Sequence, residues 1–215
     1  MKKKPVYSVL KRAFDLFFSL LAIVLLLLPM LIVAIAVKLD SKGPVFFKQD
    51  RVGKNKKLFK ILKFRSMYTD TDTNAPTHQL QAADSHITKV GRFIRRTSID
   101  ELPQIYNIFL GQMSFVGPRP ALWNQDDLVA ERDRYHANDV KPGLTGLAQI
   151  SGRDELEIDV KAKLDGEYVE KRGVFCDLSL LFRTVFSVFR HEGVVEGGTG
   201  ELHKREEDGT GDGDG

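Results

Sequence analysis

The sequence feature that most restricts the fold is an uncharged, apolar stretch at residues 16–37. As one straight helix it would extend about 33 Å, which is enough to match a hydrocarbon core of about 30 Å. A cleaved signal peptide is a poor alternative, because its apolar part normally has only about 7 to 15 residues. We therefore expect residues 13–38 to form a membrane-associated helix, preceded by a basic N-terminal segment at residues 1–12.

Basic residues lie on both sides of this stretch. They are Lys2, Lys3, Lys4, Lys11 and Arg12 before it, and Lys38, Lys42, Lys48, Arg51, Lys54, Lys56 and Lys57 after it. Because lysine and arginine favour the cytoplasmic side of a membrane, both ends prefer the same face. Pro29 would break the helix by removing a backbone hydrogen bond, which allows the chain to enter and return. The residues alone leave this re-entrant helix and a kinked spanning helix as equal alternatives.

The remainder of the 215-residue chain has the length of one domain, which we place at residues 39–192. Residues 193–215 are rich in Gly, Asp and Glu and have little to bury, so we expect them to be disordered. Cys176 is the sole cysteine, which excludes an intramolecular disulfide. The five histidines lack the short spacings of zinc sites, so we expect any metal to be held by oxygen ligands.

The domain is predicted to be mainly α with short β segments. Residues 44–49 and 58–64 are aromatic and partly alternating, which suits strands or interfacial segments on either side of a turn at residues 50–57. Residues 69–86 are polar and predict a loop. Residues 142–153 contain three glycines, which predict a structured loop whose backbone approaches a ligand or another segment closely.

Helical periodicity occurs in three places after residue 100. Apolar side chains recur at helical spacing between the pair Asp100-Glu101 and Gly111, a residue that suits the end of a helix. Residues 156–171 and 177–190 predict two further helices. The last of these combines large apolar residues with arginine, which suits a core helix or a helix on a membrane surface, and we expect the core helix.

The pair Asp100-Glu101 is the strongest candidate for chemistry. Two arginines, Arg95 and Arg96, precede it at the expected start of a helix. Either Ser98 with Glu101, as a capping box, or Asp100 would cap this helix. The positive end of the helix and the arginines would keep Asp100 ionised, and an ionised carboxylate attacks phosphorus or binds Mg²⁺. A bare Asp-Glu pair is weak evidence alone, because other adjacent acids occur in the chain.

Further basic residues suit phosphate recognition. Arg119 lies between two prolines, which would fix its guanidinium for a phosphate, although these residues alone favour a solvated arginine on a rigid turn. Lys63 and Arg65 flank Phe64 and would suit a diphosphate or anionic lipid headgroups.

The order of the motifs resembles the small monotopic phosphoglycosyl transferases, the bacterial sugar transferase family that starts glycan assembly on undecaprenyl phosphate. The resemblance covers about residues 8–192. It rests on five motifs in the same order: KRAFD, GPVFFKQDRVG, FKILKFRSM, RRTSIDELPQIYNIFLGQMSFVGPRP and KPGLTGLAQISGR.

The resemblance implies a re-entrant membrane helix hairpin broken at Pro29, with interfacial amphipathic helices around a small cytoplasmic catalytic domain. The protein would then lie in the bacterial inner membrane with its catalytic domain on the cytoplasmic face. Many relatives have serine before this proline, whereas this chain has Leu28, so any hydrogen bond from that serine is absent.

The resemblance also implies the reaction. A sugar-1-phosphate would pass from a UDP-sugar to undecaprenyl phosphate with release of UMP, as the first membrane step of polysaccharide or glycoconjugate synthesis. Asp100 would be the nucleophile that forms an aspartyl phosphosugar, and Glu101 would hold Mg²⁺ or prepare the acceptor phosphate. Asp100 and Glu101 together would bind the Mg²⁺ cofactor.

Four basic residues match family positions that we assign to the substrate phosphates or nucleotide: Lys63, Arg95, Arg119 and Arg153. Asp165 and Tyr168 also match the family pattern, for which a structural role is an equal alternative.

The main alternative function is a non-enzymatic, membrane-anchored protein that binds anionic lipid or nucleic acid through its basic segment. A hydrolase that transfers the phosphosugar to water is a second. On the family reading the partners are a UDP-sugar, undecaprenyl phosphate and membrane lipids, with no nucleic acid. The sequence does not name the sugar and leaves the oligomeric state open, a homodimer included.

Overall fold

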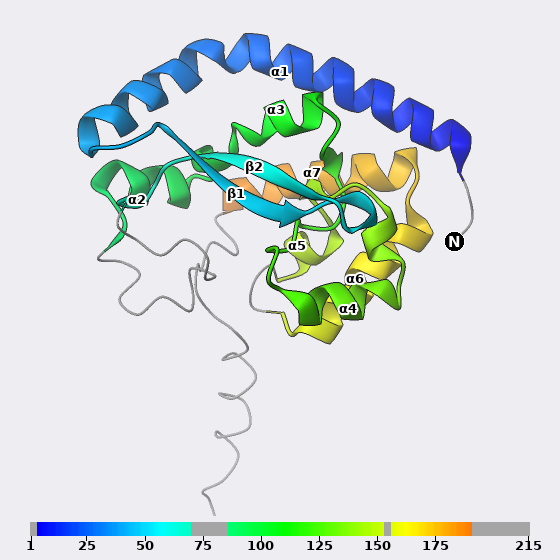
Figure 1. Cartoon of the computed structure of the whole chain (residues 1–215). Coiled ribbons are helices and arrows are strands. Elements are labelled where there is room, and N and C mark those ends of the chain that lie inside the picture. The colour runs from blue at the N-terminus through cyan, green and yellow to red at the C-terminus, as the bar shows by residue number, and fades with distance from the viewer. Residues whose placement is uncertain (1–3, 70–85, 153–155, 191–215) are drawn as a thin grey trace, which may run out of the picture.

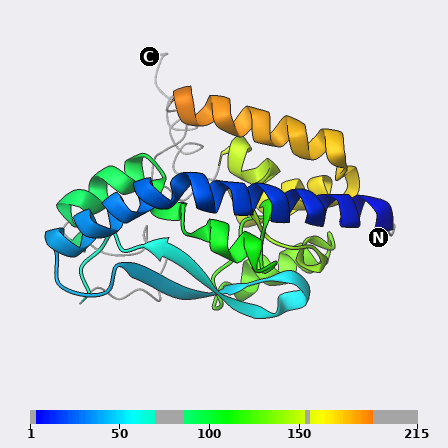
Figure 2. The same cartoon turned by 90° about the horizontal axis from the view of Figure 1, so that it is seen from above.

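The computed structural model describes residues 4–69, 86–152 and 156–190, which form a mainly helical domain with two small sheets (Figure 1). A long N-terminal helix, α1 (Pro5–Asp40), lies across the whole domain. Seen from above, α1 runs between α7 (Val174–Arg190) on one side and the β1–β2 hairpin on the other (Figure 2). The expected fold class, helices with short strands, is therefore confirmed.

The helix α1 continues through Pro29 without interruption. The break into two pieces that we expected is therefore wrong for the helix itself. Proline removes only one hydrogen bond of the helical ladder, and this loss commonly bends a helix without ending it. Figure 1 shows α1 bowed with its concave side toward the domain. Met30 and Val37, on the C-terminal part, are buried against that domain.

The two faces of α1 differ in their surroundings. Asp15, Ser19, Met30 and Val37 are buried on the face that meets the domain. The outer face is exposed and apolar along its length, and includes Val9, Phe17, Leu20, Val24, Leu27, Leu28, Leu31, Ile32 and Ile35. Soluble proteins rarely expose a continuous apolar surface of this kind. Among the helices that the structure describes, α1 is the one that is long and apolar enough to cross a membrane.

The hairpin that follows α1 matches the expected strands. β1 (Phe46–Val52) and β2 (Leu58–Phe64) pair antiparallel, with Phe46 opposite Phe64, and the short helix η1 (Lys54–Lys56) connects them. Phe59 and Ile61 of β2 are buried in a small core with Ile108 and Met113. The two segments that the sequence indicated as strands or interfacial segments are therefore strands.

The segment around the acidic pair folds differently from the expectation. After α2 (Lys89–Arg96), the chain forms a single 3₁₀ turn, η4 (Ile99–Glu101), and the helix α3 (Gln104–Phe109) begins only beyond Pro103. Neither expected cap forms, because Ser98 has a left-handed backbone with φ of 55° and makes no side-chain cap bond. The acids therefore precede the helix. Gly111, with φ of 82°, does follow the helix end as expected.

The C-terminal half consists of a parallel strand pair covered by helices. β3 (Ser114–Val116) pairs with β4 (Gly143–Thr145), and the helical elements are α4 (Asp126–Asp133), η5 (Ala137–Asp139), α5 (Leu147–Ser151), α6 (Ile158–Lys171) and α7. Val116, Ala137, Tyr168, Val169 and Leu180 form the core between them. The two last helices were predicted, although α7 begins three residues earlier than expected, at Val174.

Several expectations fall on other parts of the chain. Most of the predicted loop at residues 69–86 lies outside the described residues, as do the tail at residues 193–215 and the first three residues of the basic segment.

Candidate active site

The carboxylate of Glu101 lies between two cations that come from distant parts of the chain. Its Oε1 atom accepts a hydrogen bond from Lys63 Nζ at 2.8 Å and another from Arg119 Nη2 at 3.1 Å. Lys63 and Glu101 keep only 18% of their side-chain surface exposed, and Arg119 keeps 35%. Three residues that the sequence singled out separately are thus brought together.

Lys63 owes its position to the way β2 is fixed to α3. Asn107 of α3 is buried, and its side chain bonds the β2 backbone twice: Oδ1 accepts from Leu62 N at 3.0 Å and Nδ2 donates to Lys60 O at 2.8 Å. These bonds satisfy backbone groups of the strand that would otherwise lack partners. The sequence analysis did not identify Asn107, because one polar residue on a helix face gives no signal for a contact so distant along the chain.

Arg119 is positioned by a crossing of two glycine-rich segments. Gly117 N donates to Thr145 O at 2.8 Å, and Gly143 N donates to Pro118 O at 2.8 Å. A Cβ on Gly143 would lie 2.1 Å from Gly117 N, and one on Gly146 would lie 2.1 Å from Gly117 O. Glycine is therefore required for this approach, which confirms the expected close contact with another segment, although residues 143–145 and 147–151 form β4 and α5 and not a loop. Arg119 leaves the crossing two residues later.

Asp100 lies beside this ion-pair group and is buried, with 7% of its surface exposed. The 3₁₀ turn η4 sets the adjacent acids Asp100 and Glu101 on a short, constrained piece of backbone between α2 and Pro103. Burial shields this carboxylate from bulk water, which strengthens its interactions with nearby charges.

The electrostatics keep Glu101 ionised. Burial alone would raise the pKa of the Glu101 carboxyl, but the charges of Lys63 and Arg119 and their hydrogen bonds outweigh burial and hold the pKa well below its ordinary value. Glu101 is therefore a carboxylate throughout the physiological pH range.

The remaining predicted site residues have different outcomes. Arg95 is half-buried in the last turn of α2, the helix that packs against η4. Arg153 lies outside the described residues. Arg65, which we considered for a diphosphate or lipid headgroup, is instead buried. Its guanidinium donates to the carbonyl oxygens of Val37, Ser41 and Lys42, so it caps the C-terminal end of α1.

Asp165 has a structural role. It is buried on α6 and accepts hydrogen bonds from both Nε and Nη2 of Arg132 on α4, with the Nε distance at 2.8 Å. A bidentate pair of this kind fixes the relative position of two helices.

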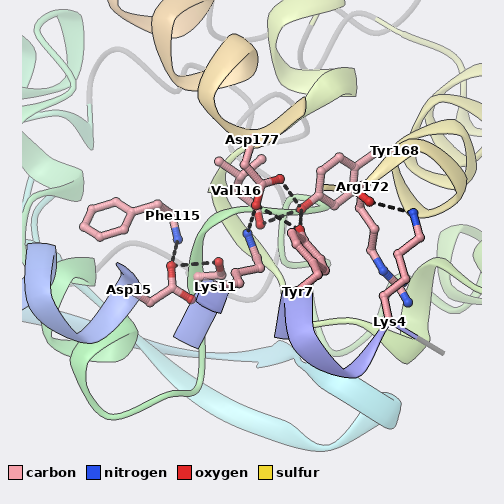
Figure 3. A network of polar contacts seen from close by, with 10 residues as sticks. Lys4, Tyr7, Lys11, Asp15, Phe115, Val116, Tyr168, Arg172 and Asp177 are labelled. Atoms are coloured by element: carbon pink, nitrogen blue, oxygen red, sulfur yellow. Dashed lines mark hydrogen bonds and ion pairs between the residues drawn. The ribbon is translucent and has the colours of Figure 1, made fainter. Parts of the chain in front are cut away.

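Tyr168 also has a structural role, at the N-terminal part of α1 (Figure 3). Its hydroxyl donates to Asp177 Oδ1 at 3.0 Å and lies 3.4 Å from the hydroxyl of Tyr7. Asp177 Oδ2 accepts from Tyr7 at 2.8 Å and from Lys11 at 2.7 Å. This network joins α1 to α6 and α7.

The carboxylates of Asp100 and Glu101 suit a Mg²⁺ ion whose other ligands are water or substrate. No group of three or more acidic, histidine or cysteine side chains suited to a metal occurs among the residues that the structure describes. Mg²⁺ commonly takes only one or two carboxylates from the protein and completes its coordination with water and substrate phosphates. Two successive carboxylates, Asp100 and Glu101, fit that pattern.

Comparisons of the sequence with known proteins identify a family. The family model described as bacterial sugar transferase matches residues 6–191. The exopolysaccharide production protein PSS of Rhizobium leguminosarum is 44% identical, over 83% of this chain and 94% of its own length. The undecaprenyl-phosphate glucose phosphotransferase of Komagataeibacter xylinus is 43% identical over 81% of this chain. The undecaprenyl-phosphate galactose phosphotransferase of Salmonella typhimurium is 36% identical over 86% of this chain. The chain spans only 35% and 41% of the length of these last two relatives.

Proposed function

Because the chain belongs to the bacterial sugar transferase family, we propose that it transfers a sugar-1-phosphate from a UDP-sugar to undecaprenyl phosphate. The names of relatives support both substrates: one is a UDP-glucose:undecaprenyl-phosphate glucose-1-phosphate transferase of Escherichia coli, 41% identical over 86% of this chain and 41% of its own length. Named relatives act on different sugars, glucose and galactose among them, so the proposal stops at the class of donor.

The observation that carries the proposal is the group of Glu101, Lys63 and Arg119 beside the buried Asp100. A diphosphate carries several negative charges, and two cations at a fixed separation suit its recognition. The negative Glu101 holds both cations in place before the substrate arrives, so little reorganisation is needed when it binds. A protein that only bound lipid would have no need for a buried carboxylate next to this group.

In the reaction, the Asp100 carboxylate attacks the phosphorus that carries the sugar. The bond from this phosphorus to the bridging oxygen breaks, the electron pair leaves with UMP, and the sugar phosphate remains bound to Asp100 as an acyl phosphate. The phosphate oxygen of undecaprenyl phosphate then attacks the same phosphorus and releases Asp100. Lys63 and Arg119 stabilise the negative charge on the phosphate oxygens in both steps.

Asp100 and Glu101 are the residues that would hold Mg²⁺ together with the substrate phosphates. The ion would supply charge neutralisation for the diphosphate and the leaving group.

The contacts of α1 support a re-entrant placement with both ends on one side of the membrane. Near its start, Lys4 Nζ donates to Arg172 O at 2.6 Å. At its other end, Asp40 accepts from Val90 N at 3.0 Å, and Arg65 donates to Ser41 O at 2.7 Å. A straight spanning helix would separate its ends by about 30 Å of hydrocarbon, so one domain could not bind both.

In this placement the bowed α1 lies in one leaflet with its exposed apolar face toward the lipid chains. Exposed phenylalanines on α7, namely Phe175, Phe182 and Phe186, give a second apolar surface suited to the interface. The positive residues on both sides of the apolar stretch favour the cytoplasmic face. A soluble nucleotide sugar and a lipid phosphate would then meet at the surface of the cytoplasmic membrane.

The proposal is tested with protein in nanodiscs, supplied with Mg²⁺, undecaprenyl phosphate and a panel of UDP-sugars, by following UMP release. We expect UMP that depends on the acceptor, from one or a few donors. The Asp100→Asn variant should be inactive, whereas Asp126→Asn, an exposed acid on α4, should match the wild type.

Other outcomes identify the alternatives. UMP release that needs no acceptor would indicate a hydrolase, and no release with folded protein would indicate an anchored lipid-binding protein. Intact-mass analysis without acceptor should show one phosphosugar per wild-type chain and none on Asp100→Asn. Full activity of that variant would exclude Asp100 as the nucleophile.

A further inference from the structure

Basic side chains meet at the end of α3, on the side of α1 that faces the domain. Arg12 of α1 donates from Nη1 to Ile108 O at 2.9 Å and from Nη2 to Phe109 O at 2.8 Å. These carbonyls form the negative end of α3, which holds the guanidinium in one place. Arg12 uses only two of its five N–H groups for these bonds, so others are available to a ligand.

Lys141 lies close to the same place. A Cβ atom built on Gly111 would be 3.3 Å from Arg12 Nη2 and also 3.3 Å from Lys141 Nζ. The two cationic nitrogens therefore lie within a few ångströms of one point beside Gly111. Among the residues that the structure describes, Lys141 Nζ has no hydrogen bond or ion pair.

The charge of this pair is not neutralised by the protein around it. Burial and then the neighbouring Arg12 lower the pKa of the Lys141 amine, and Lys54 and Lys11 act in the same direction. The acid that opposes them is Asp15, whose carboxylate is buried and already accepts from Ser114 Oγ at 3.0 Å and from Phe115 N at 3.1 Å (Figure 3). Lys11 is paired with Asp177, whereas neither Arg12 nor Lys141 forms an ion pair with a carboxylate in the part of the chain that the structure describes.

Apolar residues border the same place. Leu110, directly before Gly111, is exposed, and Leu16, one turn along α1 from Arg12, is exposed at the start of the uncharged stretch. Positive charge next to an exposed apolar surface is the environment that a lipid headgroup requires, because the phosphate meets cations while the acyl chains stay in hydrocarbon. A soluble phosphate would gain nothing from the leucines.

We propose that Arg12 and Lys141 bind the phosphate of an anionic membrane phospholipid, whose acyl chains lie against α1 and Leu110. The bound lipid bridges the membrane helix and the loop that leads into β4. This site depends on the membrane placement of the proposed function, but not on the transfer reaction.

The experiment uses full-length protein released from nanodiscs that contain equal amounts of phosphatidylglycerol and phosphatidylcholine, with retained lipid counted by native mass spectrometry. The variant is Lys141→Gln, because Arg12 also caps α3 and its loss would disturb the fold. Lys163→Gln, an exposed lysine on α6, is the matched control for the loss of one charge. We expect retained phosphatidylglycerol to fall about fivefold in Lys141→Gln, to return in Lys141→Arg, and to stay unchanged in Lys163→Gln.

Three results would overturn the proposal. In the first, Lys141→Gln retains as much phosphatidylglycerol as the wild type. In the second, Lys163→Gln loses as much as Lys141→Gln, which would show that diffuse surface charge holds the lipid and not a specific site. In the third, millimolar inorganic phosphate or undecaprenyl phosphate displaces the retained lipid, which would show that Arg12 and Lys141 bind another ligand. UMP release, measured on the same samples, separates a failure of this site from a failure of the proposed reaction.

Discussion

The ammonium group of Lys63 lies 2.8 Å from Oε1 of Glu101, although 38 residues separate them in the chain. Lys63 stands near the end of β2, whose next residues hold the C-terminal end of α1 through Arg65. The same short segment therefore touches both the acidic pair and the membrane helix. The position of the Glu101 carboxylate is thus tied to the position of α1.

Replacing Lys63 with methionine should reduce transferase activity strongly. The change keeps the length of the side chain but removes one of the two cations at Glu101, and loss of one group that stabilises a transition-state charge costs about 100-fold or more in turnover. Acceptor-dependent UMP release at saturating donor measures the effect. Lys60→Met is the control, because Lys60 lies on the same strand and forms only an exposed pair with Asp50. A similar loss in both variants would contradict a specific role for Lys63.

Acid should weaken the fold partly through Glu101. The pKa of Glu101 is held below its ordinary value in the folded state. As the pH falls through about 4.3, the carboxyl group therefore binds a proton in the unfolded chain but not in the folded protein. Stability from this carboxylate is complete at neutral pH and is lost as the pH falls. Between pH 5.5 and 3.5, wild type should lose about 1 kcal/mol more unfolding free energy than Glu101→Gln. Urea titrations in detergent micelles measure both, and equal losses would show that the carboxyl is not depressed.

Asp165→Asn should destabilise the protein without changing the chemistry. The substitution leaves Arg132 buried without its carboxylate, which costs about 3 kcal/mol of unfolding free energy. Turnover per folded molecule should equal that of the wild type. Arg134→Gln, which removes the exposed pair with Glu131, should cost less than about 1 kcal/mol. A folded Asp165→Asn protein with lost turnover would instead place Asp165 in the reaction.

Both ends of α1 should be accessible from the same side of the membrane. Single cysteines at Ser8 and Lys42, which are both exposed, are introduced into a Cys176→Ser background. An impermeant maleimide should label both in inside-out vesicles and neither in right-side-out vesicles. Labelling of the two positions from opposite sides would mean that α1 spans the bilayer.

Local pattern predicted most elements of the fold. The apolar stretch identified α1, and alternation around Phe59 and Ile61 identified β2, because burial on one face imposes a period that survives in the sequence. The glycines at 143 and 146 predicted a close backbone approach, which the crossing with Gly117 confirms. These features depend on residues near one another in the chain.

The sequence did not predict features that depend on contacts between distant segments. Pro29 indicated a break in the helix. In the structure the helix is continuous and bowed, and Met30 and Val37 on its C-terminal part pack against the domain. The role of Arg65 was missed, because nothing local distinguishes an arginine that caps a helix from one that awaits a phosphate. The meeting of Lys63, Glu101 and Arg119 likewise required the folded chain, although the family motifs had named each residue.

The network that joins Tyr7 and Lys11 to Asp177 has a consequence for biosynthesis. The helix α1 leaves the ribosome before every other described element, whereas Asp177 lies at the start of the last of them, α7. At about 5 to 20 residues per second, roughly ten seconds or more of translation separate the two. During that time α1 lacks the partners that hold it in the finished fold. A nascent chain released before α7 would keep its membrane helix but lack the side chain that fastens it.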